Sequence, residues 1–214
     1  GYLIGEGGMT VDGTITFSSK DADMVDIYKR FMEDRLGLNV VHDGGSNYDY
    51  KTHDTYARGY FEQVGIDKSD AYNKTIPKCI LKAPRNIVAS FIMGLFDTDG
   101  GISNGYLEFC TASEKMSKQL QTLLLNFGII STRTKKYNKK FKTYSYRICI
   151  MSSNVDLYRD NIGFSCKRKQ DRLVEICNVK RNPNKDIIPY QKNNVNEIFA
   201  KKRSLSKLVF AKSF

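Results

Sequence analysis

Apolar and polar positions follow the same order twice along this chain. Each copy opens on a mostly apolar stretch that ends in an acid and a glycine, GYLIGEGG in residues 1–8 and FIMGLFDTDGG in residues 91–101. A strand-like run that contains a phenylalanine follows in each copy, in residues 14–21 and 106–114. Self-similarity at a fixed offset of about 90 positions predicts two copies of one structural unit.

Behind each strand-like run, apolar residues recur at helical spacing, which predicts an amphipathic helix. The first of these helices should end at Gly37 and the second at Gly128, where a left-handed C-cap is expected. A polar, aromatic-rich hairpin follows in both copies, with its turn at residues 43–45 or near Asn138.

A last short helix closes each copy, over residues 56–66 and 156–164. The unit therefore reads helix, two strands, helix, two strands, helix. Two units predict an α+β fold, a pseudo-twofold pair of αββαββα repeats with the opening helices at the interface and two antiparallel, saddle-shaped sheets. We expect the repeats at 1–85 and 86–175 and a basic extension at 176–214.

Composition argues against several classes of protein. The chain has 214 residues, of which 41% are hydrophobic, enough to build a core. It has no apolar run of the roughly 18 residues that a membrane helix needs, so we expect a soluble, intracellular protein with no membrane partner. Five cysteines without a C-x-x-C pair and only two histidines give poor support for a disulfide framework, a structural zinc site or a histidine-based hydrolase.

The charge of the chain is strongly positive and clustered. Its 34 Lys and Arg against 23 Asp and Glu give a formal net charge of +11, which favours a polyanionic partner. Residues 132–147 interleave basic residues with tyrosines in a strand-like pattern, and residues 166–172 and 200–207 form further basic clusters.

The opening helix of the second copy carries two stripes. Ile87, Phe91 and Leu95 recur every fourth position and predict a core face. A parallel stripe of small residues predicts a close approach to the first opening helix, as in GxxxG pairs. This stripe consists of Ser90, Gly94 and Thr98, and Gly1 and Gly5 occupy the matching places in the first copy.

Each opening helix ends in an acid, although a helix C-terminus already carries partial negative charge. Two such ends brought together are best completed by a cation, and an oxygen-only donor set indicates Mg²⁺. The repeat pairs Asp99 with Glu6 but Asp97 with Ile4. We therefore expect Asp99 and Glu6 to bind metal, and Asp97 to bond to backbone or to a basic neighbour.

These motifs resemble those of the LAGLIDADG homing endonucleases. IMGLFDTDG, residues 92–100, is similar to the nine-letter motif along its whole length, and GYLIGEG, residues 1–7, is similar to its last seven letters. KTIP, residues 74–77, and IGFSCKRK, residues 162–169, resemble lysine-bearing segments of the intein-encoded branch. The resemblance covers about residues 1–175 and implies a monomer with two motifs.

The resemblance also implies roles for particular residues. Glu6 and Asp99 become the metal-binding catalytic acids, with the carbonyl groups of Gly5 and Thr98 as further ligands. The implied metal is Mg²⁺, with Mn²⁺ or Ca²⁺ as substitutes. Lys74 matches the catalytic lysine of the K-x-I-P segment, and its best counterpart in the second repeat is Lys169, with Lys167 close behind.

The sequence departs from the family pattern in three ways. Glutamate replaces aspartate at Glu6, which predicts unequal cutting of the two strands. The first motif lacks its first two letters, since the chain starts at Gly1, and this indicates an excised or trimmed segment. The chain does not begin with a splicing nucleophile or end in His-Asn, so we expect it not to splice.

The family places its sheets in the DNA major groove, so base readout should come from the hairpins. Alternation puts Lys142, Tyr144 and Tyr146 on one strand face and Thr143, Ser145 and Arg147 on the other, and the pattern leaves open which face is exposed. The candidate DNA-binding residues are Tyr48, Tyr50, Lys51, Arg58, Arg133, Lys135, Lys136, Lys139, Lys140, Lys142, Tyr144, Tyr146, Arg147 and Lys167.

The predicted function is a site-specific endonuclease that hydrolyses both strands of an extended DNA duplex target with Mg²⁺ and leaves short 3′ overhangs. The alternative is a catalytically inactive nucleic-acid binder on the same scaffold, either an RNA maturase or a DNA-binding regulator. An acid in both motifs favours the nuclease, because a pure binder gains nothing from carboxylates that face phosphates. The tail from residue 193 either adds DNA contacts or caps the core.

Overall fold

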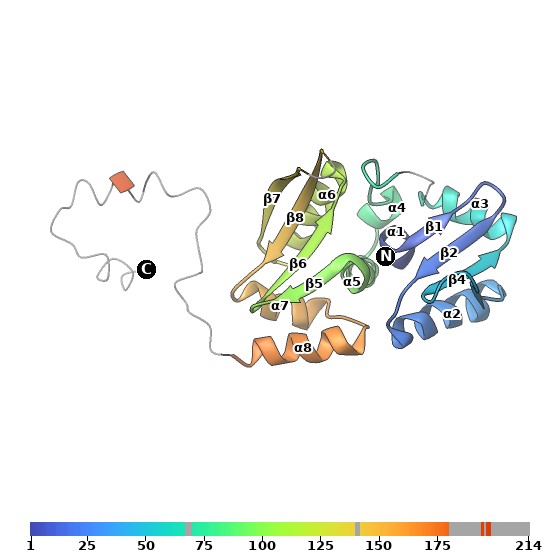
Figure 1. The fold of residues 1–214 in the computed structure, drawn as a ribbon. Coiled ribbons are helices and arrows are strands. Elements are labelled where there is room, and N and C mark those ends of the chain that lie inside the picture. The colour runs from blue at the N-terminus through green and yellow to red at the C-terminus, as the bar shows by residue number, and fades with distance from the viewer. Residues whose placement is uncertain (67–69, 140–141, 180–193, 195, 198–214) are drawn as a thin grey trace. The chain divides into compact units, whose positions relative to one another are not determined.

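The structure is a computed structural model that describes residues 1–66, 70–139, 142–179, 194 and 196–197 (Figure 1). Residues 1–179 form one compact unit, and a second unit begins at residue 180. Lys140, the basic cluster at 200–207 and almost all of the predicted tail lie outside the described residues.

The first repeat has the predicted order of elements, and a short extra helix follows it. Its elements are α1 (Tyr2–Gly5), β1 (Gly7–Met9), β2 (Thr14–Ser18), α2 (Ala22–Leu36), β3 (Val41–His42), β4 (Asp49–His53) and α3 (Thr55–Gln63), followed by α4 (Lys78–Leu81). Helix α2 ends, as expected, at Gly37 in the left-handed conformation, with φ of 67°.

The second repeat has the same order, and again a further helix follows. Its elements are α5 (Arg85–Asp99), β5 (Gly100–Ser103), β6 (Tyr106–Thr111), α6 (Glu114–Leu125), β7 (Ser131–Asn138), β8 (Thr143–Ile150) and α7 (Asn154–Asn161), followed by α8 (Lys167–Cys177). The predicted α+β fold with two antiparallel sheets is confirmed.

The two sheets are built alike. Their strand orders are β1-β2-β4-β3 and β5-β6-β8-β7, and all pairings are antiparallel. The strand after each acid pairs with an aromatic of the next strand, Gly7 with Phe17 and Gly100 with Phe109. Both phenylalanines are fully buried, so each sheet has one face that packs against helices.

Helices α1 and α5 lie between the two sheets and pack directly on each other (Figure 1). A methyl group placed on Gly5 would lie 2.0 Å from the Thr98 hydroxyl, and one on Gly94 would lie 3.0 Å from the Cα of Gly1. The predicted close contact of the motif helices is therefore present at two places, between Gly5 and Thr98 and between Gly1 and Gly94. It depends on glycine at Gly5 because no Cβ fits against Thr98.

The N-terminal half of α5 differs from the expectation. Phe91 and Leu95 are buried, but Ile87 is 45% exposed and Ser90 is exposed as well. The buried face of α5 begins instead with Val88, which lies in the hydrophobic core around α5 and α6. The core stripe therefore covers less of the helix than the spacing predicted.

Each repeat has its own hydrophobic core, and each core takes in residues of the other repeat. The first core contains Ile15, Phe17, Met24 and Met32, and also Cys166 from the second repeat. The second core is built around α5 and α6 and includes two residues that precede Arg85 in sequence, Ile4 and Ile76.

No helix among the described residues is long and apolar enough to cross a membrane. The five cysteines are all free thiols.

Candidate functional site

The two predicted metal-binding acids meet where the motif helices end. Helix α5 ends at Asp99, and Glu6 is the C-cap residue of α1. The pKa of the Asp99 carboxyl is raised to about 6, chiefly by burial and also by the nearby Glu6 carboxylate, while Lys74 and Lys169 act in the opposite direction. The four residues expected to be catalytic thus interact electrostatically in one place.

Lys74 closes the C-terminal end of α1. Its ammonium group donates to the carbonyl oxygens of Ile4 at 2.6 Å and Gly5 at 2.9 Å. A cation at this position stabilises a helix end whose carbonyl groups lack partners in the helix.

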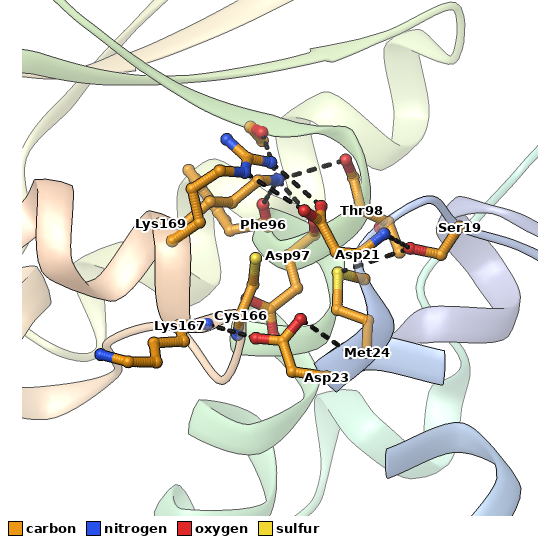
Figure 2. A network of polar contacts seen from close by, with 12 residues as sticks. Ser19, Asp21, Asp23, Met24, Phe96, Asp97, Thr98, Cys166, Lys167 and Lys169 are labelled. Atoms are coloured by element: carbon orange, nitrogen blue, oxygen red, sulfur yellow. Dashed lines mark hydrogen bonds and ion pairs between the residues drawn. The ribbon is translucent and has the colours of Figure 1, made fainter. Parts of the chain in front are cut away.

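Lys169 closes the end of α5 in the same way (Figure 2). Its ammonium donates to the carbonyl oxygens of Phe96, Asp97, Thr98 and Gly100, at 2.9 Å for Phe96 and 2.7 Å for Gly100. The side chain is buried, and desolvation lowers its pKa from the ordinary lysine value. The structure therefore places Lys169, rather than its neighbour Lys167, at the position equivalent to Lys74.

Asp97 has a different role from Asp99. Its carboxylate is buried and accepts hydrogen bonds from the backbone amides of Ser165 at 3.2 Å and Cys166 at 3.1 Å, from the Ser165 hydroxyl, and from the Tyr2 hydroxyl at 3.2 Å. These contacts hold the segment before α8 against α5. The expected bonding of Asp97 to backbone is observed.

The donor set suits a hard divalent cation. Glu6 and Asp99 supply carboxylate oxygens at two helix ends that are already negative, and a cation would relieve their repulsion. Of the two expected carbonyl ligands, that of Gly5 already accepts a close hydrogen bond from Lys74, whereas that of Thr98 lies 3.4 Å from Lys169. The described residues contain no group of three or more Asp, Glu, His or Cys side chains that could hold a metal ion, so phosphates and waters would have to complete the shell.

A groove opens beside the acids and is lined by both repeats. Its walls include Glu6, Ser18 and Tyr48 from the first repeat and Gly101, Arg168 and Arg172 from the second. Tyr48 is 53% exposed, so this candidate DNA-binding residue lies at the surface, in the same groove that Glu6 lines.

Strand pairing settles which side chains of the second hairpin lie on the open face of its sheet. Arg147 pairs with Thr134, and Lys136 pairs with Ser145. These positions alternate with buried Tyr146, Ile148 and Ile150, so they lie on the face opposite the core. Arg147 lies 3.4 Å from Glu108, whereas Lys136 is exposed.

Four other candidates of this hairpin lie on the helix-covered side of the sheet. Tyr146 is 6% exposed and donates to Glu114, and Tyr144 packs against Tyr137 on the same side. Lys135 lies over the Tyr144 ring at 4.1 Å, and Arg133 lies over the Tyr146 ring at 5.6 Å. Lys139 and Lys142 are exposed in the turn.

The first repeat has two basic candidates, Lys51 and Arg58, and only Lys51 lies on the open face of its sheet. Lys51 pairs with Thr16 on that face and lies 3.2 Å from Asp43. Tyr50 packs against the core. Arg58 lies on α3, where it pairs with Glu62 at 2.6 Å and donates to the Val11 carbonyl. On α8, Lys167 pairs with Asp171 at 2.8 Å.

Sequence reasoning missed a set of contacts that join the repeats. The Arg168 guanidinium pairs with Asp21 at 3.0 Å. The Lys167 amide donates to Asp23 (Figure 2). Asp23 and Lys167 are 144 positions apart, and nothing in the local sequence of either indicates a partner.

Comparison with known families supports this architecture. Residues 86–163, which make up most of the second repeat, match the family model described as a LAGLIDADG-like domain. The first repeat lies outside this match and is related to the second by its element order and strand register.

Two solved structures share the fold. The homing endonuclease I-DmoI in complex with DNA and Ca superposes with a TM-score of 0.59 over 82% of this chain and 92% of that chain, at 14% identity. Full-length DUF199/WhiA from Thermatoga maritima superposes with a TM-score of 0.54 over 94% of this chain and 63% of that chain, at 17% identity. Structures of I-DmoI with Mg and Mn have a similar likeness.

Curated relatives are much longer than this chain. A Replication factor C small subunit from Methanocaldococcus jannaschii is 31% identical over 209 residues, covering 92% of this chain and 11% of the relative. A probable translation initiation factor IF-2 from Thermococcus kodakarensis is 35% identical over 111 residues, covering 50% of this chain and 9% of the relative. The chain thus spans about a tenth of the length of these relatives.

Proposed function

We propose that this chain is a site-specific endonuclease that hydrolyses phosphodiester bonds in both strands of a DNA duplex with a divalent cation and leaves short 3′ overhangs. The observation that carries this proposal is the meeting of Glu6 and Asp99 at two helix ends, each end closed by a lysine. One chain supplies both acids, so the proposed enzyme acts as a monomer with one catalytic acid for each strand.

Glu6 and Asp99 would hold Mg²⁺, and the Thr98 carbonyl is the better placed of the two backbone ligands. When bound, the cation would polarise the scissile phosphate and lower the pKa of the attacking water. Mn²⁺ or Ca²⁺ could take the same oxygen ligands. The structures of I-DmoI with Mg, Mn and Ca support a divalent cation on this fold.

Lys74 and Lys169 place positive charge beside the acid pair. Their electrostatic effect lowers the pKa of the Asp99 carboxyl and so opposes its protonation. Because carbonyl oxygens hold the two ammonium groups, their positive charge is fixed near the acid pair before substrate arrives, which favours electrostatic stabilisation of charge on a phosphate. Both residues are therefore proposed to be catalytic.

The open sheet faces are the proposed DNA-binding surfaces. Lys51, Lys136 and Arg147 lie on these faces, and Lys139 and Lys142 extend the second surface at its turn. These residues suit contacts to phosphates and base edges. We do not assign base readout to Tyr50, Arg133, Lys135, Tyr144 or Tyr146, because they lie on the helix-covered side.

We further propose that the chain is the endonuclease segment of an intein-type insertion. The support is that it matches about a tenth of two longer relatives whose names are unrelated, a replication factor and a translation factor. A module found within proteins of unrelated function is expected of an inserted element.

The second candidate function is nucleic-acid binding without cleavage. Its support is the fold similarity to WhiA, which is not named as an endonuclease and which covers more of this chain than I-DmoI does. The pair of acids at the motif ends favours the nuclease.

A cleavage selection on randomised duplex DNA with Mg²⁺ tests the proposal. Wild type should recover a recurring extended site cut in both strands, and Asp99→Asn should bind that site without cutting it. Equal cutting by both proteins contradicts the role of Asp99. Tight, salt-dependent binding without cleavage in Mg²⁺ or Mn²⁺ favours the second candidate.

A further inference from the structure

Lys169 belongs to the second repeat, but the segment that carries it is anchored in the first. Cys166 is fully buried in the first hydrophobic core, beside Phe17 and Met24. The next two residues bind the start of α2. The Lys167 amide donates to Asp23 (Figure 2), and the Arg168 guanidinium donates to Asp21. Three consecutive residues before Lys169 therefore contact the first repeat, in addition to the bond between the Cys166 amide and Asp97 of α5.

Lys74 shows the reverse arrangement. Ile76, two residues further on, is 1% exposed and lies in the second hydrophobic core. The Ile76 amide donates to the Gln119 side chain at 2.9 Å, and the Lys74 carbonyl accepts from the Ser113 hydroxyl at 2.7 Å. Ser113 caps α6, and Gln119 lies on that helix, so the second repeat holds the lysine segment of the first.

The two anchors are equivalent in the repeats. Helices α2 and α6 occupy the same place in the order of elements, and each receives the lysine segment of the other repeat at or near its N-terminal end. In both cases one buried side chain, Cys166 or Ile76, is combined with two polar contacts. An exposed ion pair by itself contributes little to stability. Here the polar contacts of each segment accompany a buried side chain, and together they hold the backbone of the lysine segment in place.

We propose that each lysine is positioned by the opposite repeat: Asp21 and Asp23 set the position of Lys169, and Ser113 and Gln119 set that of Lys74. All four are positioning residues, since they act through the lysine segments. For its catalytic consequence this inference rests on the proposed nuclease function. Each half of the site then depends on a helix of the other repeat, so neither repeat forms a complete site by itself.

Lysine labelling tests the positioning without any DNA. Wild type and variants are dimethylated briefly with formaldehyde and a borohydride reagent, and the modification of each lysine is measured by mass spectrometry. Asp21→Ala/Asp23→Ala should raise the labelling of Lys169 several-fold and leave Lys74 unchanged. Asp26→Ala, on the same helix, is the matched control and should change neither.

The opposite variant should give the opposite result. Gln119→Ala, alone or with Ser113→Ala, should raise the labelling of Lys74 and leave Lys169 as it was. The single substitution also serves if the double variant does not fold. Unchanged labelling of the expected lysine overturns the proposal, and so does an equal rise at both lysines, which would mean general loosening of the fold.

Strand-resolved cleavage tests the catalytic consequence. Asp21→Ala/Asp23→Ala should slow the cutting of one strand by about tenfold to a hundredfold, and Gln119→Ala that of the other strand. The charge exchange Asp21→Arg/Arg168→Asp should restore the strand ratio towards that of wild type. A general loss of stability would slow both strands together.

The outcomes separate the two proposals. If wild type cuts no DNA, the proposed function fails, and the labelling result still decides how the lysines are positioned. If the labelling shifts as expected but both strands are cut as in wild type, the positioning has no role in cutting and the catalytic consequence is overturned.

Discussion

The two repeats share one topology but differ in their second hairpins, β3-β4 and β7-β8. Strands β3 and β4 have two and five residues, whereas β7 and β8 have eight each. Residues 39–53 contain one lysine and two aspartates, whereas residues 131–150 contain seven Lys and Arg and no acid. A shared fold thus leaves charge free to vary, and of the two hairpins the second carries the greater positive charge to attract a polyanion.

The motif ends differ as well, although their geometry is matched. Lys74 binds two carbonyl oxygens of α1, and Lys169 binds four at the end of α5. Gly5 and Thr98 take equivalent places, but only one of them carries a side chain. Close packing at this contact allows room for a single side chain, so the two repeats cannot both carry a Cβ there.

The largest expected effect on stability comes from placing a side chain at Gly5, so that both repeats carry one at this contact. A Cβ on Gly5 would lie 2.0 Å from the Thr98 hydroxyl and 2.7 Å from the Thr98 Cβ. Gly5→Ala should therefore separate α1 from α5 and lower the free energy of unfolding by about 3 kcal/mol, measured in urea. Thr98→Gly in the same chain should recover part of this loss.

Gly44→Ala is the matched control, because a Cβ at Gly44 would meet nothing within 4 Å. It should change the free energy of unfolding by less than about 0.5 kcal/mol. An equally small effect of Gly5→Ala would contradict the close contact of the motif helices.

The next effect separates the two lysines. Lys169→Met leaves four carbonyl oxygens at the end of α5 without their cation and should cost about 2 kcal/mol of stability. Lys74→Met leaves two such oxygens and should cost about 1 kcal/mol. Urea unfolding at one pH compares the two directly, and equal losses would show that the number of bound carbonyl groups does not matter.

A third prediction concerns the charge difference between the hairpins. Lys136→Ala/Lys142→Ala removes two exposed cations and should weaken DNA binding about tenfold, with the slope of affinity against salt reduced by about 2. Lys51→Ala should have a smaller effect, because Lys51 is already paired with Asp43 at 3.2 Å. Titrations of the selected duplex at several salt concentrations measure both slopes. The reverse order would place the main contact surface on the first repeat.

The smallest effect tests the burial of Asp99. Its pKa is raised from 3.8 to about 6, so the folded protein binds this proton more tightly than the unfolded chain does. Stability is therefore lost as the pH rises from about 4 to 6, and above 6 the wild type holds a buried carboxylate beside Glu6. In EDTA at pH 8, Asp99→Asn should raise the free energy of unfolding by about 1 kcal/mol, because it removes the buried charge. The melting temperature should rise by a few degrees as a result.

At pH 4 this gain should largely vanish, since the wild-type carboxyl is then mostly protonated. A gain of equal size at pH 4 and pH 8 would mean that the stabilisation does not come from removing a charge.

The fold could be predicted from the sequence because its signals are local and occur twice. Helical spacing, the glycine at position 37 and the paired motifs each indicate an element, and the offset between copies joins them into one unit. The stripe of small residues also predicted which faces of α1 and α5 meet. Ile87 was misassigned, because spacing alone does not show how far along α5 its neighbours extend.

The sheet faces could not be predicted from alternation alone. In TYSYRICI both faces begin with polar or aromatic residues, and the buried face becomes clearly apolar only at Ile148 and Ile150. The contacts between repeats were also beyond sequence reasoning. Asp23 and Lys167 meet only because Cys166 enters the first core, and this depends on the packing of the complete fold.

Strand-resolved cleavage of the selected site tests the central claim most directly. The two strands of the duplex carry different labels, and cutting with Mg²⁺ is compared for wild type, Glu6→Gln and Asp99→Asn. Wild type should cut both strands, and each variant should lose about a hundredfold or more, chiefly on a different strand, while still binding the duplex. Cutting of both strands at the wild-type rate by both variants would contradict the account.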